Sequence, residues 1–276
     1  METSPFSGGL GWELKLKIVP TKWTGVEKIF EESSDKERDI KLVKYIYNCQ
    51  FLTAVQIMQA PIWQMYTGVD KKYINLLARG GYLVKHNIFN KGSVLPIYSA
   101  GPGAYFKNIS DTYKTNFYRN YGLTTVLKIL SVNQLFLRML KFAYARISFN
   151  ILPPYTAEIY YIEKRHGPYL ENKDKEKTLR LISLRNYTSD VAEMKRQLPK
   201  VDDKAVIIAH DLTVLEELTQ VLADKDNFRY TSDGILFREK LANAFYMYNN
   251  KKMVQTYLQN FDENINVALI NTSLLL

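Results

Sequence analysis

Residues 70–100 read DKKYINLLARGGYLVKHNIFNKGSVLPIYSA. The apolar residues Ile74, Leu77 and Ala78 recur at helical spacing behind Asp70, a residue type that caps the amino termini of helices. Gly80-Gly81 ends this pattern, and two short strand-like runs follow, joined by Asn-Lys-Gly-Ser. The stretch therefore predicts one helix followed by a two-stranded ribbon.

The residues before this stretch predict two more helices. Residues 36–50 carry apolar side chains at helical spacing, and Thr53 is placed to cap a short helix, AVQIMQA, that Pro61 ends. Three helices followed by a ribbon are the layout of a winged helix-turn-helix. We therefore expect a winged-helix DNA-binding domain over residues 36–120. Residues 1–35 are expected to form an N-terminal arm, in which WELKLKIV alternates like a short strand.

The positive charge of the chain is concentrated in its middle third. The 276 residues carry a net charge of +9. Residues 67–150 contain twelve Lys and Arg but only two acidic residues, while residues 1–66 are neutral and residues 151–276 carry −1. A localised surplus of this kind indicates a polyanionic partner better than a uniform one does.

The predicted third helix and ribbon supply the donors that a DNA interface needs. If Ile74, Leu77 and Ala78 turn inward, the outer helix face carries Lys, Arg and Asn, which bind phosphates and base edges in the major groove. A solvated helix face beside a charged hairpin is the alternative. The candidate DNA-binding residues are Lys71, Lys72, Asn75, Arg79, Lys85, His86 and Lys91.

Beyond residue 120 the pattern changes twice. Residues 121–150 are expected to form a connecting helix that is apolar on both sides, where Lys128 and Arg138 either extend the phosphate-binding surface or face solvent. Pro153-Pro154 ends it. Over residues 151–276 the strand-like runs YTAEIYYIEK, KTLRLISLRN and KAVIIAH alternate with helical ones, which predicts a small α/β domain.

Several stretches resemble the replication-relaxation family of plasmid and mobile-element proteins: ERDIKLVKYIYNCQFLTAVQI (37–57), INLLARGGYL (74–83), YSAGPGAYF (98–106) and LSVNQLFLRML (130–140). The resemblance covers residues 36–237. It implies an amino-terminal winged helix followed by an α/β domain similar to restriction-endonuclease-like folds. It also implies a DNA-binding protein of a plasmid, phage or mobile element.

An active nuclease of that fold places Asp on one strand and Glu-x-Lys on the next, because two carboxylates must hold Mg²⁺. Residues 181–185, LISLR, lack any carboxylate, so we expect the fold to be degenerate. The literal Glu193-Met194-Lys195 falls in a predicted helix, where it is expected to face solvent. His210-Asp211 follows a buried strand, although Asp211 is equally suited to capping the next helix. Other residues considered for catalysis or metal binding are Glu163, His166, Asp174, Asp202 and Asp203.

The sequence therefore favours a sequence-specific, double-stranded DNA-binding protein without catalysis, acting in replication or transcription control. A metal-dependent nuclease or nicking enzyme using Asp174 or Glu163 is the alternative, and a protein-interaction module is a third reading. One cysteine and three scattered histidines offer no zinc-ligand spacing, so no cofactor is expected. Neither a membrane span nor a secretory signal is found, which predicts a cytoplasmic, nucleoid- or plasmid-associated protein. A homodimer and a replication or transcription partner stay open.

Overall fold

The computed structural model describes residues 6, 11–20, 36–60, 70–102, 114–142, 144–152, 156–163, 176–185, 187–197, 204–217, 227–249, 252–258 and 261. They fall into two compact units. The first contains the described residues between 9 and 126, and the second contains those from 127 onward together with Phe6. Helices and antiparallel strands mix in the first unit, and a mixed sheet forms the second, so the predicted α+β class is confirmed.

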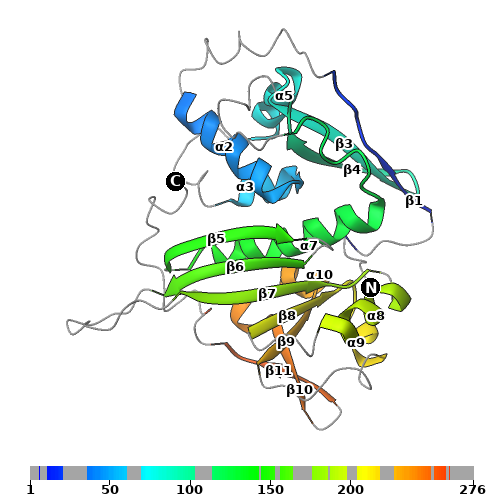
Figure 1. The fold of residues 1–276 in the computed structure, drawn as a ribbon, viewed down its shortest axis with the longest axis vertical. Helices are drawn as coiled ribbons and strands as arrows, with labels where there is room; N and C mark the ends of the chain where they lie inside the picture. Colours follow the sequence, from blue (N-terminus) through cyan, green and yellow to red (C-terminus); the bar gives the residue numbers. More distant parts are fainter. Residues whose placement is uncertain are drawn as a thin grey trace, which may run out of the picture. The chain divides into compact units, whose positions relative to one another are not determined.

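The first unit is built on a four-stranded antiparallel sheet in the order β1-β3-β4-β2 (Figure 1). Along the chain these elements follow in the order strand, helix, strand, helix, helix, hairpin. The elements are β1 (Trp12–Lys15), α2 (Lys36–Cys49), β2 (Leu52–Thr53), α3 (Ala54–Gln59), α5 (Lys71–Arg79), β3 (Leu83–Asn90) and β4 (Ser93–Ala100).

Local signals in the sequence set the helix boundaries. Thr53 forms a capping box with Gln56, in which each side chain bonds the other residue's backbone N–H, so α3 starts here. The carboxylate of Asp70 accepts a hydrogen bond of 2.8 Å from the backbone N–H of Tyr73 and caps α5. Caps of this kind each contribute about 1 kcal/mol to helix stability. Both predicted caps are confirmed.

The ribbon turns at Lys91-Gly92, as predicted. Asn90 pairs with Ser93, and the two residues between them have φ values of 44° and 87°. Two consecutive positive φ values define the type I′ turn, whose twist matches that of a two-stranded ribbon. At the other end of the ribbon, a Cβ on Gly101 would lie 1.9 Å from the carbonyl oxygen of Gly81, so only glycine fits.

A seven-stranded sheet in the order β11-β10-β9-β8-β7-β6-β5 forms the second unit (Figure 1). The central pairs β7·β8 and β8·β9 are parallel and all others antiparallel. The elements from the end of the first unit onward are α7 (Leu123–Met139), β5 (Tyr144–Leu152), β6 (Thr156–Glu163), β7 (Lys177–Ser183), α8 (Tyr187–Gln197), β8 (Lys204–Ala209), α9 (Leu212–Glu217), β9 (Phe228–Ser232), α10 (Asp233–Arg238), the short 3-10 helix η2 (Leu241–Asn243), β10 (Phe245–Asn249) and β11 (Lys252–Thr256).

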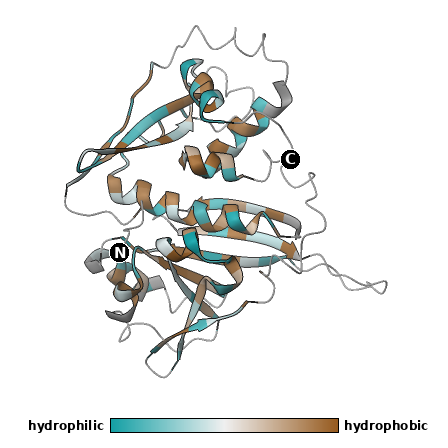
Figure 2. Cartoon of the chain, turned by 180° about the vertical axis from the view of Figure 1, so that it is seen from behind, coloured by the Kyte–Doolittle hydropathy of each residue, from teal (hydrophilic) through white to brown (hydrophobic). Residues whose placement is uncertain are grey.

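The central strand of the second unit is buried after its exposed first residue, Lys204. Residues Ala205 to Ala209 of β8 are all buried, in agreement with the continuous apolar run in the sequence. Most side chains of α7 are also buried, and Phe136 stacks on Phe149 of β5 with ring centroids 4.5 Å apart. Figure 2 shows hydrophobic residues interspersed with hydrophilic ones along α7, and among its buried polar residues is Ser131.

One predicted boundary needs correction. The helix expected over residues 121–150 ends at Met139, and residues 144–152 form β5, because Ile147 is buried while its neighbours Ser148 and Asn150 are exposed, as in a strand. The short strand predicted within WELKLKIV is present as β1, which pairs with β3. Within the described residues, no helix is long and apolar enough to cross a membrane.

Candidate nucleic-acid interface

Helix α5 presents positive charge outward because its apolar residues anchor it. Ile74 and Leu77 are buried, so Lys71, Lys72 and Arg79 lie on the exposed side. The hydroxyl of Tyr73 also donates to the carboxylate of Asp39, a buried residue of α2, which fixes the helix about its axis. The predicted orientation of α5 therefore follows from its packing.

Leu76 and Asn75 complete the outer side of α5. Leu76 lies between Lys72 and Arg79 on the same face and is 46% exposed. Asn75 is half-buried, and its side-chain oxygen accepts a hydrogen bond of 3.3 Å from the hydroxyl of Tyr98 in β4. This contact connects the helix to the ribbon and limits the rotamers that Asn75 can adopt.

The ribbon contributes two exposed cations. Lys85 projects from β3, and Lys91 lies at the hairpin tip. Together with the three exposed cations of α5 they form one positively charged set on consecutive elements of the first unit.

No protein-family model matches the chain, and no curated protein or solved structure does. The case for a DNA interface therefore depends on the placement of these residues.

The inclusion of His86 needs correction. Its side chain is only 1% exposed and packs against the rings of Phe51 and Tyr118. Its Nδ1 accepts a hydrogen bond of 2.9 Å from the backbone N–H of Lys17, and its Nε2 lies 2.9 Å from the hydroxyl of Ser99. Burial, helped by the nearby Lys17, lowers the pKa of His86 from 6.5 to about 3. His86 is therefore a neutral core residue and cannot contact a polyanion.

The alternation of the strand explains this correction. Successive side chains of a strand point to opposite faces, so Lys85 and His86 cannot share one. The sequence already contained this signal. What the sequence did not show is the pairing of β1 with β3, which sets Lys15 opposite Asn87 and adds a third strand to the ribbon. Pairing between distant segments has no local signature.

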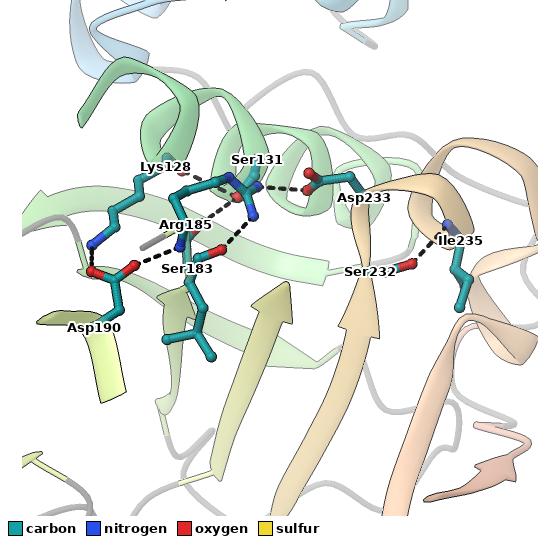
Figure 3. Close-up of polar contacts among 9 residues, drawn as sticks. Lys128, Ser131, Ser183, Arg185, Asp190, Ser232, Asp233 and Ile235 are labelled. Carbon is teal, nitrogen blue, oxygen red and sulfur yellow. Dashed lines mark hydrogen bonds and ion pairs between the residues drawn. The ribbon is translucent and has the colours of Figure 1, made fainter. Parts of the chain in front are cut away.

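A polar network of charged side chains lies at the carboxyl ends of the central strands of the second unit (Figure 3). The guanidinium of Arg185, just after β7, binds the Asp233 carboxylate at 2.7 Å, and both side chains are at most 2% exposed. Asp190 binds the Lys128 ammonium and accepts a hydrogen bond of 2.5 Å from the Arg185 backbone N–H. These contacts join α7, α8 and α10 to the end of β7.

Two hydroxyls at the same strand ends belong to this network. Ser131 of α7 and Ser183 of β7 lie 2.8 Å apart, and both are buried. Each carboxylate of the network has a basic partner, so its charges neutralise one another.

Lys128 and Arg138 do not extend a phosphate-binding surface, because Lys128 binds Asp190 and Arg138 donates to two backbone carbonyls. Those carbonyls belong to Leu236 and Glu239, each at 2.5 Å.

Of the residues considered for catalysis, the structure describes the side chains of Glu193, His210 and Asp211. Asp211 accepts a hydrogen bond of 3.1 Å from the backbone N–H of Thr213, which is the capping role expected for it. His210 is half-buried, and burial, followed by the nearby Arg185, lowers its pKa. Among the described residues, no group of three or more His, Cys, Asp or Glu could hold a metal ion. His166, Asp174, Asp202 and Asp203, and the side chain of Glu163, lie outside the described part of the structure.

Two further carboxylates, on β6 and α8, form ion pairs. Glu158 of β6 is bound by Arg180 of β7 through two hydrogen bonds of 3.0 and 3.2 Å. Glu193 of α8 binds Arg196 at 2.7 Å, and the neighbouring Met194 is buried. Glu193 therefore forms the surface ion pair that is usual between helix residues three apart.

Proposed function

We propose that the chain is a sequence-specific, double-stranded DNA-binding protein that acts through a winged helix in its first unit. The observation that carries this proposal is the set of five exposed cations on α5 and the adjoining hairpin, Lys71, Lys72, Arg79, Lys85 and Lys91. The order helix, strand, helix, helix, hairpin supports it, as does the antiparallel pairing of β2 with β4. We assign the protein to replication or transcription control in a plasmid, phage or mobile element, the setting implied by its resemblance to the replication-relaxation family.

Each part of the interface has a distinct role in this proposal. Helix α5 enters the major groove, where Arg79 or Lys72 binds base edges and Lys71 neutralises phosphate. Lys85 and Lys91 contact phosphates beside the groove. Asn75, held by Tyr98, contacts the base edges or the backbone from a preset orientation, which reduces the entropy lost on binding.

The second unit is proposed to be a degenerate restriction-endonuclease-like domain that binds a partner or a second copy of the chain. The run from β7 through α8 to the parallel β8 supports this assignment. At the strand where Glu-x-Lys is expected, β7 carries Leu, Ile and Ser, and its Arg180 binds the carboxylate of Glu158. We therefore propose that this unit does not cleave DNA.

Fluorescence anisotropy tests the interface. The probe is a duplex selected by the protein from a random pool, titrated between about 50 and 200 mM salt. The triple variant Lys71→Ala/Lys72→Ala/Arg79→Ala should lose the contacts of α5 and lower the salt slope by about 2–3, since each phosphate contact contributes about 0.9. Arg79→Ala alone should cost about 1–3 kcal/mol if Arg79 reads a base.

The matched control removes the same charge elsewhere. Lys204, Lys240 and Lys252 are exposed cations of the second unit, and the triple alanine variant at these positions should bind as the unmodified protein does. Equal affinity of the α5 variant and the unmodified protein would overturn the assignment. Binding that does not depend on salt would instead favour a protein-interaction module. Cleavage of supercoiled plasmid in Mg²⁺ or Mn²⁺ would contradict the non-catalytic assignment of the second unit.

A further inference from the structure

One face of the ribbon is open, and the register of its strands defines that face. Paired residues of antiparallel strands lie on the same side of a sheet, and residues alternate along each strand. The inner face contains the buried side chains of Val84, His86 and Ile88. The opposite side, here termed the open face, consists of Glu13, Lys15, Lys85, Asn87, Phe89, Val94 and Pro96, and the buried Tyr98 closes it at the end beside α5.

The open face continues from the proposed DNA-reading helix. Tyr98 is buried, and its hydroxyl reaches Asn75 of α5, so the face begins at that helix. Tyr98 is paired with Lys85, and Val94 next to the hairpin tip is 52% exposed. A DNA duplex that lies against α5 would therefore also lie along this side of the ribbon.

The hairpin alone leaves a gap in the charge along this face. Lys85 and Lys91 are six residues apart, which corresponds to about 20 Å along a strand, with no cation of β3 or β4 between them on the open face. Strand β1 supplies one, because Lys15 is paired with Asn87, about 7 Å along from Lys85. The Lys15 ammonium lies 4.8 Å from the centre of the Phe89 ring, and the Lys15 side chain is 61% exposed.

Hydrogen bonds beyond β1 hold this strand in register. The backbone N–H of Lys17 donates to His86, and the Lys17 carbonyl accepts a hydrogen bond of 3.0 Å from the Tyr118 hydroxyl. Asn116 bonds both the N–H and the carbonyl of Val19, at 3.1 and 2.9 Å. The chain that follows Lys15 is thus bonded to the core of the first unit, which supports the pairing of β1 with β3.

We propose that β1 is part of the DNA-contact surface and that Lys15 binds the phosphate backbone beside the groove occupied by α5. Glu13, on the same face, opposes this contact: its carboxylate lies 3.7 Å from the Lys15 ammonium and reduces the local positive potential. The inference depends on the proposed DNA-binding function. It predicts opposite changes in DNA affinity for the loss of charge at Lys15 and at Glu13, two residues on the same face of β1.

The experiment uses the full chain and the duplex that the protein selects from a random pool. Lys15→Gln should weaken binding by about eightfold at about 0.1 M salt and lower the salt slope by about 0.9, which is the contribution of one phosphate contact. Lys15→Arg keeps the charge and should restore affinity, which separates loss of charge from loss of β1. Glu13→Gln should strengthen binding. Lys252→Gln, at an exposed lysine of the second unit, is the control and should change neither quantity.

The possible outcomes separate the inference from the function on which it depends. If the unmodified protein binds with a salt slope that Lys71→Ala lowers, while Lys15→Gln and Glu13→Gln leave affinity unchanged, the role of β1 is refuted and the winged helix stands. If Lys15→Arg binds as weakly as Lys15→Gln, the ammonium does not act as a charge, and the inference also fails. If the unmodified protein shows no salt-dependent DNA binding, both proposals fail together.

Discussion

Lowering the pH from 7.5 to 5 is expected to destabilise the first unit by about 2 kcal/mol through His86 alone. In the folded protein, Nδ1 of His86 accepts a hydrogen bond from Lys17, so it has no room for a proton. Burial holds the pKa of His86 at about 3, against 6.5 for the ordinary value. Between these values only the unfolded chain takes up the proton. Stability from this residue is therefore complete above pH 6.5 and is lost as the pH falls toward 3.

The magnitude follows from the two pKa values. Each pH unit below 6.5 costs about 1.4 kcal/mol, so the loss reaches about 2 kcal/mol at pH 5. Urea unfolding followed by the fluorescence of Trp12, which lies in β1 of the first unit, measures this loss. The free energy of unfolding is compared at several pH values between about 7.5 and 5.

The variant His86→Gln isolates the contribution of the histidine. A glutamine amide supplies an acceptor for Lys17 and a donor for Ser99 but does not titrate. It will be less stable at neutral pH, since it lacks the ring that packs on Phe51 and Tyr118. Other titrating groups contribute equally to both proteins, so the difference between the two profiles should shrink by about 2 kcal/mol at pH 5. Parallel profiles over this range would refute the buried, neutral state of His86, as would an NMR titration giving His86 a pKa near 6.5.

Two further substitutions test the packing of each unit. Gly101→Ala would place a methyl group 1.9 Å from the Gly81 carbonyl oxygen and should lower the free energy of unfolding in urea by at least about 2 kcal/mol. The control is Gly122→Ala, where nothing lies within 4 Å of the added methyl group, and it should cost no more than about 1 kcal/mol. Equal losses would contradict the close approach at Gly101. Asp233→Asn would leave the buried Arg185 guanidinium without its counter-charge and should lower stability by about 3–5 kcal/mol, measured by hydrogen exchange of β7 and β8. The control Asp211→Asn should change stability by no more than about 0.5 kcal/mol. If Asp233→Asn does not change stability, the Arg185–Asp233 pair is solvated.

Features of the first unit that depend on neighbouring residues could be predicted from the sequence. Thr53 and Asp70 cap their helices, and Lys91-Gly92 forms the turn, because each of these structures is made by residues at most three positions apart. The pairing of β1 with β3 and of β2 with β4 could not be predicted, because the partners lie far along the chain. Four residues of β1 and two of β2 give no periodicity long enough to specify a partner.

The wrong prediction after Met139 has a different cause. Leu140 and Phe142 continue the apolar pattern of α7, so a single helical period predicts one helix through residue 150. The alternation of Ile147, Phe149 and Ile151 with Ser148 and Asn150 is a strand signal within that run. A period of two that begins inside an apolar stretch is overlooked when one period is applied to the whole stretch.

The charge of the middle third must be recounted once side-chain partners are known. Twelve basic residues between positions 67 and 150 would give a salt slope of about 11 if all of them met phosphates. However, Lys128 binds Asp190, and Arg138 binds backbone carbonyls of the second unit, so neither is available. Lys15, in turn, comes from the net-neutral first 66 residues and adds a cation that the count by thirds omits.

The exposed cations of β1, α5 and the ribbon predict the salt dependence of the proposed interface. The exposed cations of the proposed interface on β1, α5 and the ribbon are Lys15, Lys71, Lys72, Arg79, Lys85 and Lys91, whereas the exposed Lys114, Arg119 and Lys141 lie outside these elements. Because each cation of the interface contributes about 0.9 when it neutralises a phosphate, together they give a slope of about 5 in anisotropy titrations of the unmodified protein. A measured value near 10 would mean that the interface extends well beyond α5 and the ribbon, since these two elements and β1 cannot supply the remaining contacts.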